Sequence, residues 1–288
     1  MVIDIRVRLP EEFRQVTREE MMEFYGKYNE IFSVYDAGMK STEVLLKEME
    51  EAEIELAVIH AEYEFGEDAN KLNEKTASLV KEYPDKFAGF GTVNLDNLKP
   101  LSLVEQAESI HQLGLKGINL QPIFFDVDPL DRRLYPLYAT AARLGLIVTF
   151  HTGVHYSMKS AITENNPLFI DQIAIDFPPL KIIACHGGWP WIPQMTAIAR
   201  RHRNVFIEFG GLDPKYIALP GSGWETLFVL MNNLLQNQIL FGTDWPVLDF
   251  ERAKKGFLQL GLKEEVLEKL FYRNAKRLLK SKEGLINV

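Results

Sequence analysis

The chain has 288 residues, of which 47% are hydrophobic, and its formal net charge at pH 7 is −8. An acidic chain with no stripe of lysine and arginine lacks the electrostatic footprint of phosphate-backbone binding, so nucleic acid is excluded as an expected partner. No uncharged run approaches the roughly 18 residues of a membrane-spanning helix, and the first residues carry no apolar signal region, so we expect a cytoplasmic protein with no membrane partner.

The first predicted element is a strand with an unusual polar face. Within residues 2–9, the apolar residues at the odd positions alternate with Asp4, Arg6 and Arg8. A period of two is typical of a strand, and it places these three charged side chains on one face. If the strand belongs to a barrel, that face points inward, and two arginines enter the interior.

After this strand, apolar runs rich in β-branched residues alternate with amphipathic helical stretches to the end of the chain. Strands are predicted at residues 2–9, 56–61, 87–94, 115–120, 146–151, 181–188, 204–211 and 238–246. Helices are predicted at residues 41–53, 68–83, 100–113, 131–144, 166–177, 191–202, 224–236, 250–261 and 263–280. Eight βα units without a linker predict an α/β fold, a single (β/α)8 TIM barrel over residues 1–288. The alternative is a doubly wound open sheet, because a count of strands from sequence is easily wrong by one.

Three of the later predicted strands end on residues that carry chemistry. They are His151 in FHTG, His186 in CHGG and Asp244 in GTDWP. Alone, each has the simpler interpretation of a hydrogen-bonded structural residue. Because side chains from separate barrel strands converge at the carboxyl ends, two imidazoles and a carboxylate there indicate an acid/base or metal site.

Other residues near these strand ends have a structural interpretation as well. Cys185, the only cysteine, agrees with a reducing compartment, and we expect it to face the helices because its neighbour His186 faces the barrel interior. Trp189, Trp191 and Trp245 follow strand ends, so they either form a wall of the site or pack between loops.

The HTG, CHGG and GTDWP strand ends, the preceding DRRLYPLYATAARLGLIVTF segment and the closing YRNAKRLL helix together resemble a known family. This is the amidohydrolase-related group (amidohydrolase family 2), which includes aminocarboxymuconate semialdehyde decarboxylase, resorcylate decarboxylase and metal-free pyrone-dicarboxylate lactonase. The resemblance covers nearly the whole chain. It implies a TIM-barrel enzyme that acts on a small carboxylated substrate, either by hydrolysis of a lactone or related ester or by decarboxylation.

The resemblance also assigns roles to individual positions. The family's strand-five histidine, usually a metal ligand, falls on His151, and its strand-six polarising histidine falls on His186. Its strand-eight aspartate, a ligand and often the proton acceptor, falls on Asp244. The departure is at strand one, where the family's two metal-binding histidines are replaced by Arg6 and Arg8. A guanidinium stays protonated and has no lone pair, so neither arginine can bind a metal.

Because two metal ligands are lost, the sequence does not decide whether a metal cofactor is bound. His151 and Asp244 hold a divalent metal, zinc or manganese, only if solvent, substrate or another side chain completes the shell. The side chains that could do so are His60, Glu62 and His155. In the metal-free version, Asp244 is the general base that activates water, while His151 and His186 polarise or protonate the substrate. No organic cofactor is expected.

The two arginines have a positive interpretation too. Two guanidiniums on one face match the oxygens of a carboxylate, so Arg6 and Arg8 are expected to bind a carboxylated substrate. The alternative, compatible with the first, is a buried ion-pair network with Asp4, Glu208 or Asp244, since buried charges must be paired. A second class of function is also open: a binding or sensor protein that kept the barrel and lost the chemistry. A homodimer is an option that the sequence does not decide.

Overall fold

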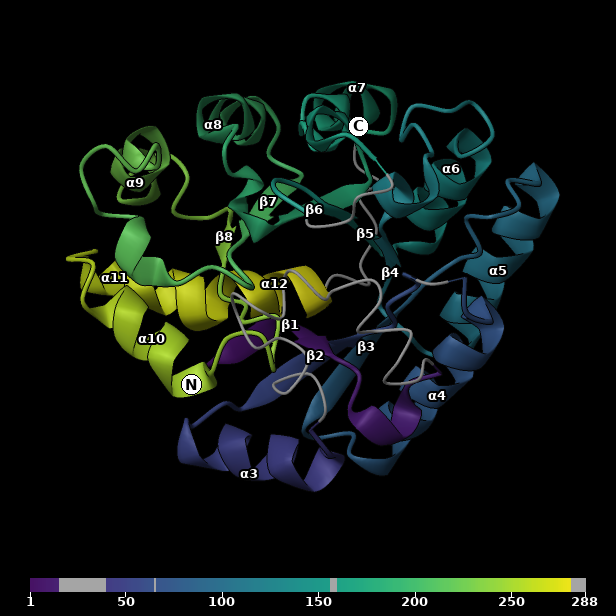
Figure 1. Cartoon of the computed structure of the whole chain (residues 1–288), viewed down its shortest axis with the longest axis horizontal. Helices are drawn as coiled ribbons and strands as arrows, with labels where there is room; N and C mark the ends of the chain where they lie inside the picture. The colour runs from purple at the N-terminus through teal and green to yellow at the C-terminus, as the bar shows by residue number, and fades with distance from the viewer. Residues whose placement is uncertain (16–39, 65, 156–159, 281–288) are drawn as a thin grey trace.

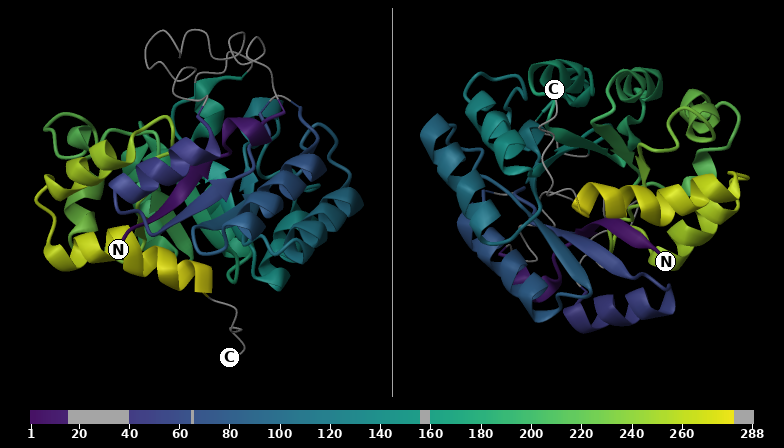
Figure 2. Two further views of the ribbon diagram at one scale, coloured as in Figure 1. Left: turned by 90° about the horizontal axis from the view of Figure 1, so that it is seen from below. Right: turned by 180° about the vertical axis from the view of Figure 1, so that it is seen from behind.

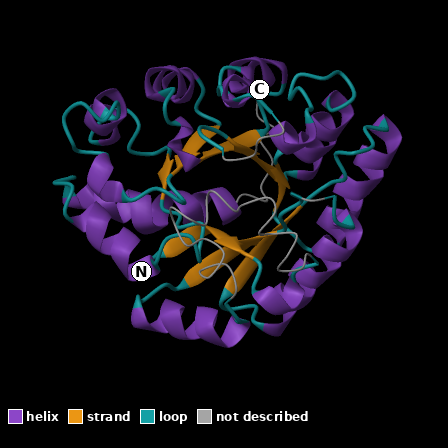
Figure 3. Cartoon of the chain, in the orientation of Figure 1, coloured by secondary structure: helices purple, strands orange, loops and turns teal. Residues whose placement is uncertain are grey.

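The computed structural model describes residues 1–15, 40–64, 66–155 and 160–280, and in it eight strands form one barrel surrounded by helices (Figures 1 and 3). The sheet runs in chain order, and each strand pairs in parallel with the next. The strands are β1 Ile3–Arg8, β2 Leu56–His60, β3 Phe87–Gly91, β4 Gly117–Leu120, β5 Ile147–His151, β6 Lys181–Cys185, β7 Val205–Glu208 and β8 Ile239–Leu240. The predicted (β/α)8 TIM barrel is confirmed, and the doubly wound alternative is not the fold.

The helices follow the strands as predicted, with some shorter than expected. They are α3 Thr42–Glu51, α4 Ala69–Glu82, α5 Pro100–Gln112, α6 Tyr135–Leu144, α7 Phe169–Asp176, α8 Ile192–Arg201, α9 Glu225–Met231, α10 Phe250–Leu258, α11 Glu264–Glu268 and α12 Asn274–Lys280. Short helical turns are η1 Glu11–Phe13, η2 Pro122–Phe125, η3 Ile162–Asn165, η4 His186–Gly188, η5 Pro214–Tyr216 and the π-helical η6 Lys269–Arg273. The predicted helix 263–280 is therefore divided, with the π-helical turn η6 between α11 and α12.

The barrel is closed by backbone hydrogen bonds between β1 and the residues that follow β8. Ile5 N donates to Phe241 O at 3.0 Å, Asp244 N donates to Arg6 O at 2.9 Å, and Arg8 N donates to Trp245 O at 2.9 Å. Closure removes the exposed sheet edges that an open sheet would leave. It also brings the end of β1 beside Asp244, although 238 residues separate Arg6 and Asp244 in the chain.

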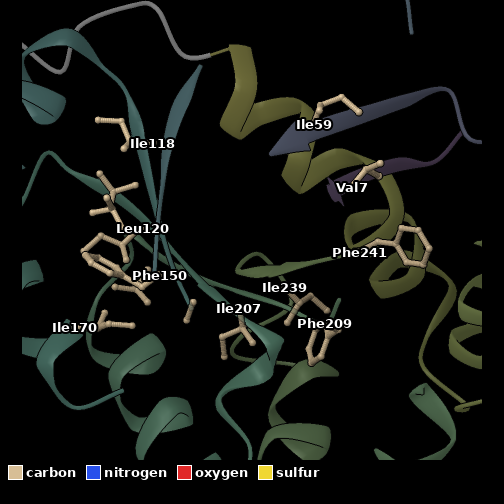
Figure 4. Packing of buried hydrophobic residues seen from close by; sticks show 14 of the residues in the cluster. Val7, Ile59, Ile118, Leu120, Phe150, Ile170, Ile207, Phe209, Ile239 and Phe241 are labelled. Carbon is tan, nitrogen blue, oxygen red and sulfur yellow. The ribbon is translucent and has the colours of Figure 1, made fainter. Parts of the chain in front are cut away.

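Two apolar cores fill the molecule. The outer core lies between strands and helices, and Figure 4 shows members of it such as Val7, Ile59 and Phe150. The inner core fills the barrel, and residues of η6 and α12 join it, among them Tyr272 and Leu278. Figure 2 shows α12 at the end of the barrel where β1 begins. Because apolar side chains fill that end, the charged residues of the interior gather at the opposite, carboxyl end.

The faces predicted for β1 are wrong at Ile3 and Ile5, which belong to the inner core, and are correct from Arg6 onward. The pairing of β1 with β2 shifts between Asp4 and Val7, where β1 carries one extra residue. Such a bulge reverses the faces, so Ile5 belongs to the inner core whereas Val7 belongs to the outer core. Arg6 still enters the interior, as predicted, because the bulge lies just before it.

None of the helices in the described ranges combines the length and apolarity that crossing a membrane requires.

Candidate active site

The five residues singled out in the sequence gather at the carboxyl end of the barrel. They are Arg6 and Arg8 of β1, His151 of β5, His186 of η4 and Asp244 after β8. Asp244 binds both arginines, and the imidazole rings of His151 and His186 lie 4.6 Å apart between centroids. A methyl group on Gly211 would lie 3.5 Å from His186 Nδ1 and 3.6 Å from Asp244 Oδ2, so these two groups are neighbours.

Asp244 is held by both guanidiniums. Its Oδ1 accepts hydrogen bonds from Arg6 Nε at 2.9 Å and Arg8 Nε at 3.1 Å, and its Oδ2 accepts one from Arg8 Nη2 at 3.0 Å. Burial alone would raise the pKa of this carboxyl group, but the charges of Arg8 and Arg6 outweigh burial and lower the pKa well below its usual range. Asp244 is therefore an ionised and poorly basic carboxylate, and the predicted ion-pair network is present.

Arg6 is enclosed by protein acceptors. Besides Asp244, its Nη2 binds Glu62 Oε1 at 3.1 Å, and its Nη1 lies 3.2 Å from His60 Nδ1 and 3.4 Å from Asn119 Oδ1. Its side chain is 1% exposed, against 10% for Arg8. Arg8 is thus the arginine that lies closer to solvent, in agreement with its place at the end of the strand.

The contact with Arg6 determines which ring nitrogen of His60 carries the proton. Since a guanidinium only donates, His60 Nδ1 must accept from Arg6, and the proton lies on Nε2, which donates to Ile5 O at 2.9 Å. Burial and the charge of Arg6 lower the pKa of His60 to about 3, so the ring is neutral. Both ring nitrogens are in use, and His60 has no lone pair for a metal.

The environment of His186 leaves one ring nitrogen available. Its Nδ1 lies 2.7 Å from Gly210 O, a pure acceptor, so Nδ1 carries the proton and Nε2 carries the lone pair. Nε2 is buried and has no hydrogen-bond partner among the described residues. Burial, and then the charge of Arg6, lower the pKa of His186 to about 4. At neutral pH the ring is uncharged and presents an acceptor.

His151 has the opposite arrangement. The side-chain amide nitrogen of Asn165 donates to Gly153 O at 2.7 Å and lies 2.6 Å from His151 Nδ1. The carbonyl of Gly153 identifies that amide atom as the donor, so His151 Nδ1 accepts and its proton lies on Nε2. Burial and the nearby His186 lower the pKa of His151 well below its usual value. His151 is therefore a neutral donor, and it lies beside His186, the neutral acceptor.

Glu208 and Asn165 are the site residues whose roles the sequence did not reveal. Glu208, considered only as a partner of the arginines, accepts hydrogen bonds from the backbone N–H groups of His186, at 3.3 Å, and Gly210. Burial raises its pKa to about 7. A Cβ atom at Gly210 or Gly242 would collide with its carboxylate. The signal was present, because Glu208 ends a strand immediately before FGG, as His186 and Asp244 end theirs.

The structure contradicts the expectation for Cys185 and decides between the two alternatives for Trp245. Cys185 does not face the helices: it belongs to the inner core, 3.6 Å from Arg6 Nη1, because His186 has a left-handed backbone with φ of 62° that interrupts the strand alternation. Trp245 is fully buried, and its Nε1 donates to Glu48 Oε2 of α3 at 2.6 Å. It packs against a helix and forms no wall of the site.

The described residues do not fit a divalent metal. No group of three or more histidine, cysteine or carboxylate side chains is arranged to hold an ion within the part of the chain that the structure describes. Both oxygens of Asp244 already accept guanidinium protons, and His151 presents a proton at Nε2. Arg6 places a positive charge beside Asp244, and this charge repels a cation.

Comparison with known proteins identifies relatives. The family model described as Amidohydrolase matches residues 35–280. Gamma-resorcylate decarboxylase from Polaromonas sp. is 23% identical over 259 residues, which cover 74% of this chain and 76% of that protein. An uncharacterised TIM-barrel protein from Bordetella bronchiseptica has a TM-score of 0.77 at 29% identity, covering 96% of this chain and 98% of that chain.

Two further solved structures share the fold. A dihydroxybenzoic acid decarboxylase from Polaromonas sp., solved with bound manganese and an inhibitor, has a TM-score of 0.71 at 15% identity and covers 98% of both chains. A probable 2-pyrone-4,6-dicarboxylic acid hydrolase from Acinetobacter baumannii, solved with citric acid bound, has a TM-score of 0.67 at 14% identity. It covers 96% of this chain and 98% of that chain.

Proposed function

Because the chain belongs to the amidohydrolase family, we propose that it is an enzyme that hydrolyses a small carboxylated lactone or related ester at the carboxyl end of its barrel. The observation that carries this proposal is the pair of neutral histidines with opposite tautomers. His186 presents a bare Nε2, and His151 presents an Nε2–H group. Hydrolysis of an ester needs both an acceptor for a proton of water and a donor to the carbonyl oxygen.

The two histidines divide the work of the reaction. His186 Nε2 takes a proton from water as the water oxygen forms a bond to the ester carbonyl carbon. His151 Nε2–H donates a hydrogen bond to the carbonyl oxygen, which gains negative charge. When the tetrahedral intermediate collapses, the carbon–oxygen bond of the ester breaks, and the proton on His186 passes to the leaving oxygen. The products are a carboxylic acid and an alcohol, and no step requires a metal.

Asp244 has a different role in this proposal from the one expected from sequence. A general base needs a free lone pair, and of two candidates the one with the higher pKa takes up the proton more readily. Asp244 accepts three hydrogen bonds from guanidiniums, which lower its pKa, so it is a poor base. We assign the base to His186, and we assign to Asp244 the charge that holds Arg6 and Arg8 in place.

Arg8 is the proposed receptor for the carboxylate of the substrate. It lies at the end of β1 with its side chain 10% exposed, whereas Arg6 is enclosed. A hydrogen bond to a charged group contributes about 1.5 to 3 kcal/mol, so Arg8→Met should raise KM by roughly tenfold or more. An unchanged KM together with a lower melting temperature would show that Arg8 only supports the structure.

Decarboxylation is the second candidate. It is favoured by the similarity to gamma-resorcylate decarboxylase, although the identity is 23%. In that reaction the carbon–carboxylate bond breaks, carbon dioxide leaves, and the Nε2 proton of His151 is transferred to the carbon that keeps the electron pair. Water returns a proton to His151 Nε2, and the hydroxide that remains combines with the carbon dioxide as bicarbonate. The paired guanidiniums argue against it, because a carboxylate stabilised by positive charge loses carbon dioxide less readily than an unpaired one.

A product analysis decides between the two reactions. The purified protein is incubated with a panel of carboxylated lactones and aromatic carboxylates, and both carbon dioxide and newly formed acid groups are measured. Hydrolysis releases acid without carbon dioxide. Since acid/base catalysis contributes about 100-fold or more, His186→Gln should lower kcat by at least that factor. Turnover of no compound in the panel by the folded protein would favour a binding or sensor protein and contradict the proposal.

A further inference from the structure

The second carboxylate at the arginine pair has no role in the proposed reaction. Glu62 follows β2, and its two oxygens divide between the two guanidiniums: Oε1 lies 3.1 Å from Arg6 Nη2, and Oε2 lies 3.2 Å from Arg8 Nη1. One carboxylate therefore spans both arginines. This is the arrangement that a bound carboxylic acid ligand would adopt on two adjacent guanidiniums.

The arginine pair has two sides, and they differ in exposure. Asp244 accepts from the Nε atoms of both arginines and from Arg8 Nη2, and its side chain is 3% exposed. Glu62 takes Arg6 Nη2 and Arg8 Nη1, and its side chain is 10% exposed. The side held by Asp244 is thus the inner, fixed side, and the side held by Glu62 is the one nearer to solvent.

We propose that Glu62 is a resident carboxyl group that occupies the carboxylate-binding site formed by Arg6 Nη2 and Arg8 Nη1, and that a carboxylated ligand binds by taking its place. The proposal rests on the proposed function in taking the carboxylate of the substrate as the natural occupant. The ligand class is a small organic carboxylate. Arg8 and Arg6 then bind the substrate only after Glu62 has turned away.

The surroundings of Glu62 allow this exchange. Glu64, two residues further along, lies 3.8 Å from the same Arg8 Nη1 and is held by a 3.0 Å hydrogen bond from Gln121 Nε2. A carboxylate thus stays near Arg8 when Glu62 leaves. Burial raises the pKa of Glu62 to about 8, so at neutral pH the group is largely protonated. A protonated acid binds guanidiniums more weakly than the carboxylate of a ligand does.

The test uses the full chain and the small anions formate and acetate as probes. Glu62→Ala empties the site and leaves its two donors without an acceptor, and Glu62→Gln fills the site with a group that has one acceptor oxygen instead of two. The melting temperature of each protein is followed against formate or acetate concentration, with chloride at equal ionic strength as the reference. A matched control is Glu108→Ala, which removes the exposed partner of Arg143, 2.8 Å away at the surface.

The expected result is a ranking of stabilisation by formate, with Glu62→Ala highest, Glu62→Gln next and wild type last. For a chain of this size, formate at about tenfold above its Kd should raise the melting temperature of Glu62→Ala by about 2–3 °C. The Glu108→Ala control should respond as wild type does. If Glu62→Ala does not fold, the comparison of Glu62→Gln with wild type still gives the order.

Equal responses of wild type, Glu62→Gln and Glu62→Ala, or no response in any of them, would overturn the proposal and make Glu62 a structural partner only. Because melting requires no turnover, this outcome is separate from the fate of the proposed function. An inactive protein with the expected ranking would contradict the enzyme and leave the anion site standing. An active enzyme without the ranking would support the proposed function and contradict the anion site.

Discussion

His186 and Asp244 both have a left-handed backbone, with φ of 62° and 57°, although neither is glycine. Such a conformation costs of the order of 1 kcal/mol or more for an ordinary residue, and it persists only where surrounding contacts enforce it. For Asp244 these contacts are the two arginines and the backbone of β1, and for His186 they are Glu208 and Gly210. Strain at the two residues fits the place where the chemistry is proposed.

At the residue scale, Asp244→Asn should cost stability as well as activity. The variant keeps the shape but removes the charge that pairs with Arg6 and Arg8, and removing one partner of a buried pair costs about 3–5 kcal/mol. Urea unfolding measures the loss, and kcat should fall more than tenfold because the arginines lose their alignment. The control is Asp213→Asn, whose carboxylate binds Arg252 near the surface and should contribute about 1 kcal/mol or less.

The raised pKa of Glu62 makes a prediction about pH. The unfolded chain releases this proton near pH 4.5, whereas the folded protein holds it to about pH 8. Between these values the folded state binds more protons, so the contribution of Glu62 to stability is complete below about pH 4.5 and is lost as the pH rises. Glu62→Gln cannot lose a proton, so its free energy of unfolding should gain on wild type from about pH 5 to about pH 8.

Denaturant unfolding of both proteins across this range measures the difference. Other buried acids, such as Glu208, occur in both proteins and cancel in the subtraction. A difference that is constant with pH, or that shrinks as the pH rises, would mean that Glu62 is ionised in the folded state. The displacement of Glu62 by a ligand would then have to overcome a full ion pair.

At the scale of elements, the turn after β8 is built around the carboxylate of Glu208 at the end of β7. A Cβ atom on Gly242 would lie well under 3.0 Å from Glu208 Oε1, so Gly242→Ala must push Glu208 away from the N–H groups of His186 and Gly210. We expect lower stability and a kcat reduced by about tenfold or more, because His186 loses the contacts that position it.

Gly89→Ala is the matched control for this prediction. It also introduces a clash, 2.6 Å from Leu115 and 2.9 Å from Thr76, but on β3 and outside the site. It should lower the melting temperature while the folded enzyme keeps its kcat. If Gly242→Ala lost only stability, and its kcat matched that of the control, the positioning role of Glu208 would be refuted.

At the scale of the whole molecule, the two guanidiniums that bind Asp244 predict a protein that is purified without a stoichiometric divalent metal. Elemental analysis should find zinc and manganese well below one equivalent, and a chelator should leave the melting temperature and any activity unchanged. The double change Arg6→His with Arg8→His should create zinc affinity, since two imidazoles two residues apart on one strand can both bind an ion. One equivalent of tightly held metal in the wild type would contradict the prediction.

The homodimer stays a prediction. Light scattering coupled to gel filtration would support it with a mass near twice that of one chain. Exposed apolar side chains occur on several helices, among them Leu101 on α5, Val229 on α9 and Leu258 on α10, and single exposed apolar residues are normal for a monomer.

Most of the fold could be predicted because the strands and helices of a barrel are recognisable from short, local sequence patterns. The strands were recognised from short apolar runs bounded by turn residues, and the helices from their 3.6-residue period. The predictions failed where the local backbone conformation departed from that of a regular strand. The bulge of β1 left Ile3 and Ile5 facing inward, and the left-handed backbone of His186 allows both Cys185 and His186 to face the interior. A pattern of residue types does not reveal either event.

The sequence by itself determined the barrel, the family, and the presence of His151, His186, Asp244, Arg6 and Arg8 at strand ends, since these depend on periodicity and on short motifs. Only the tertiary structure decided which ring nitrogen of each histidine carries the proton, that Asp244 is occupied by guanidiniums, that Glu62 spans both arginines, and that Asn165 belongs to the site. The reason is physical: tautomers, ion pairs and pKa shifts depend on atoms that lie within a few ångströms in space but many residues apart in the chain.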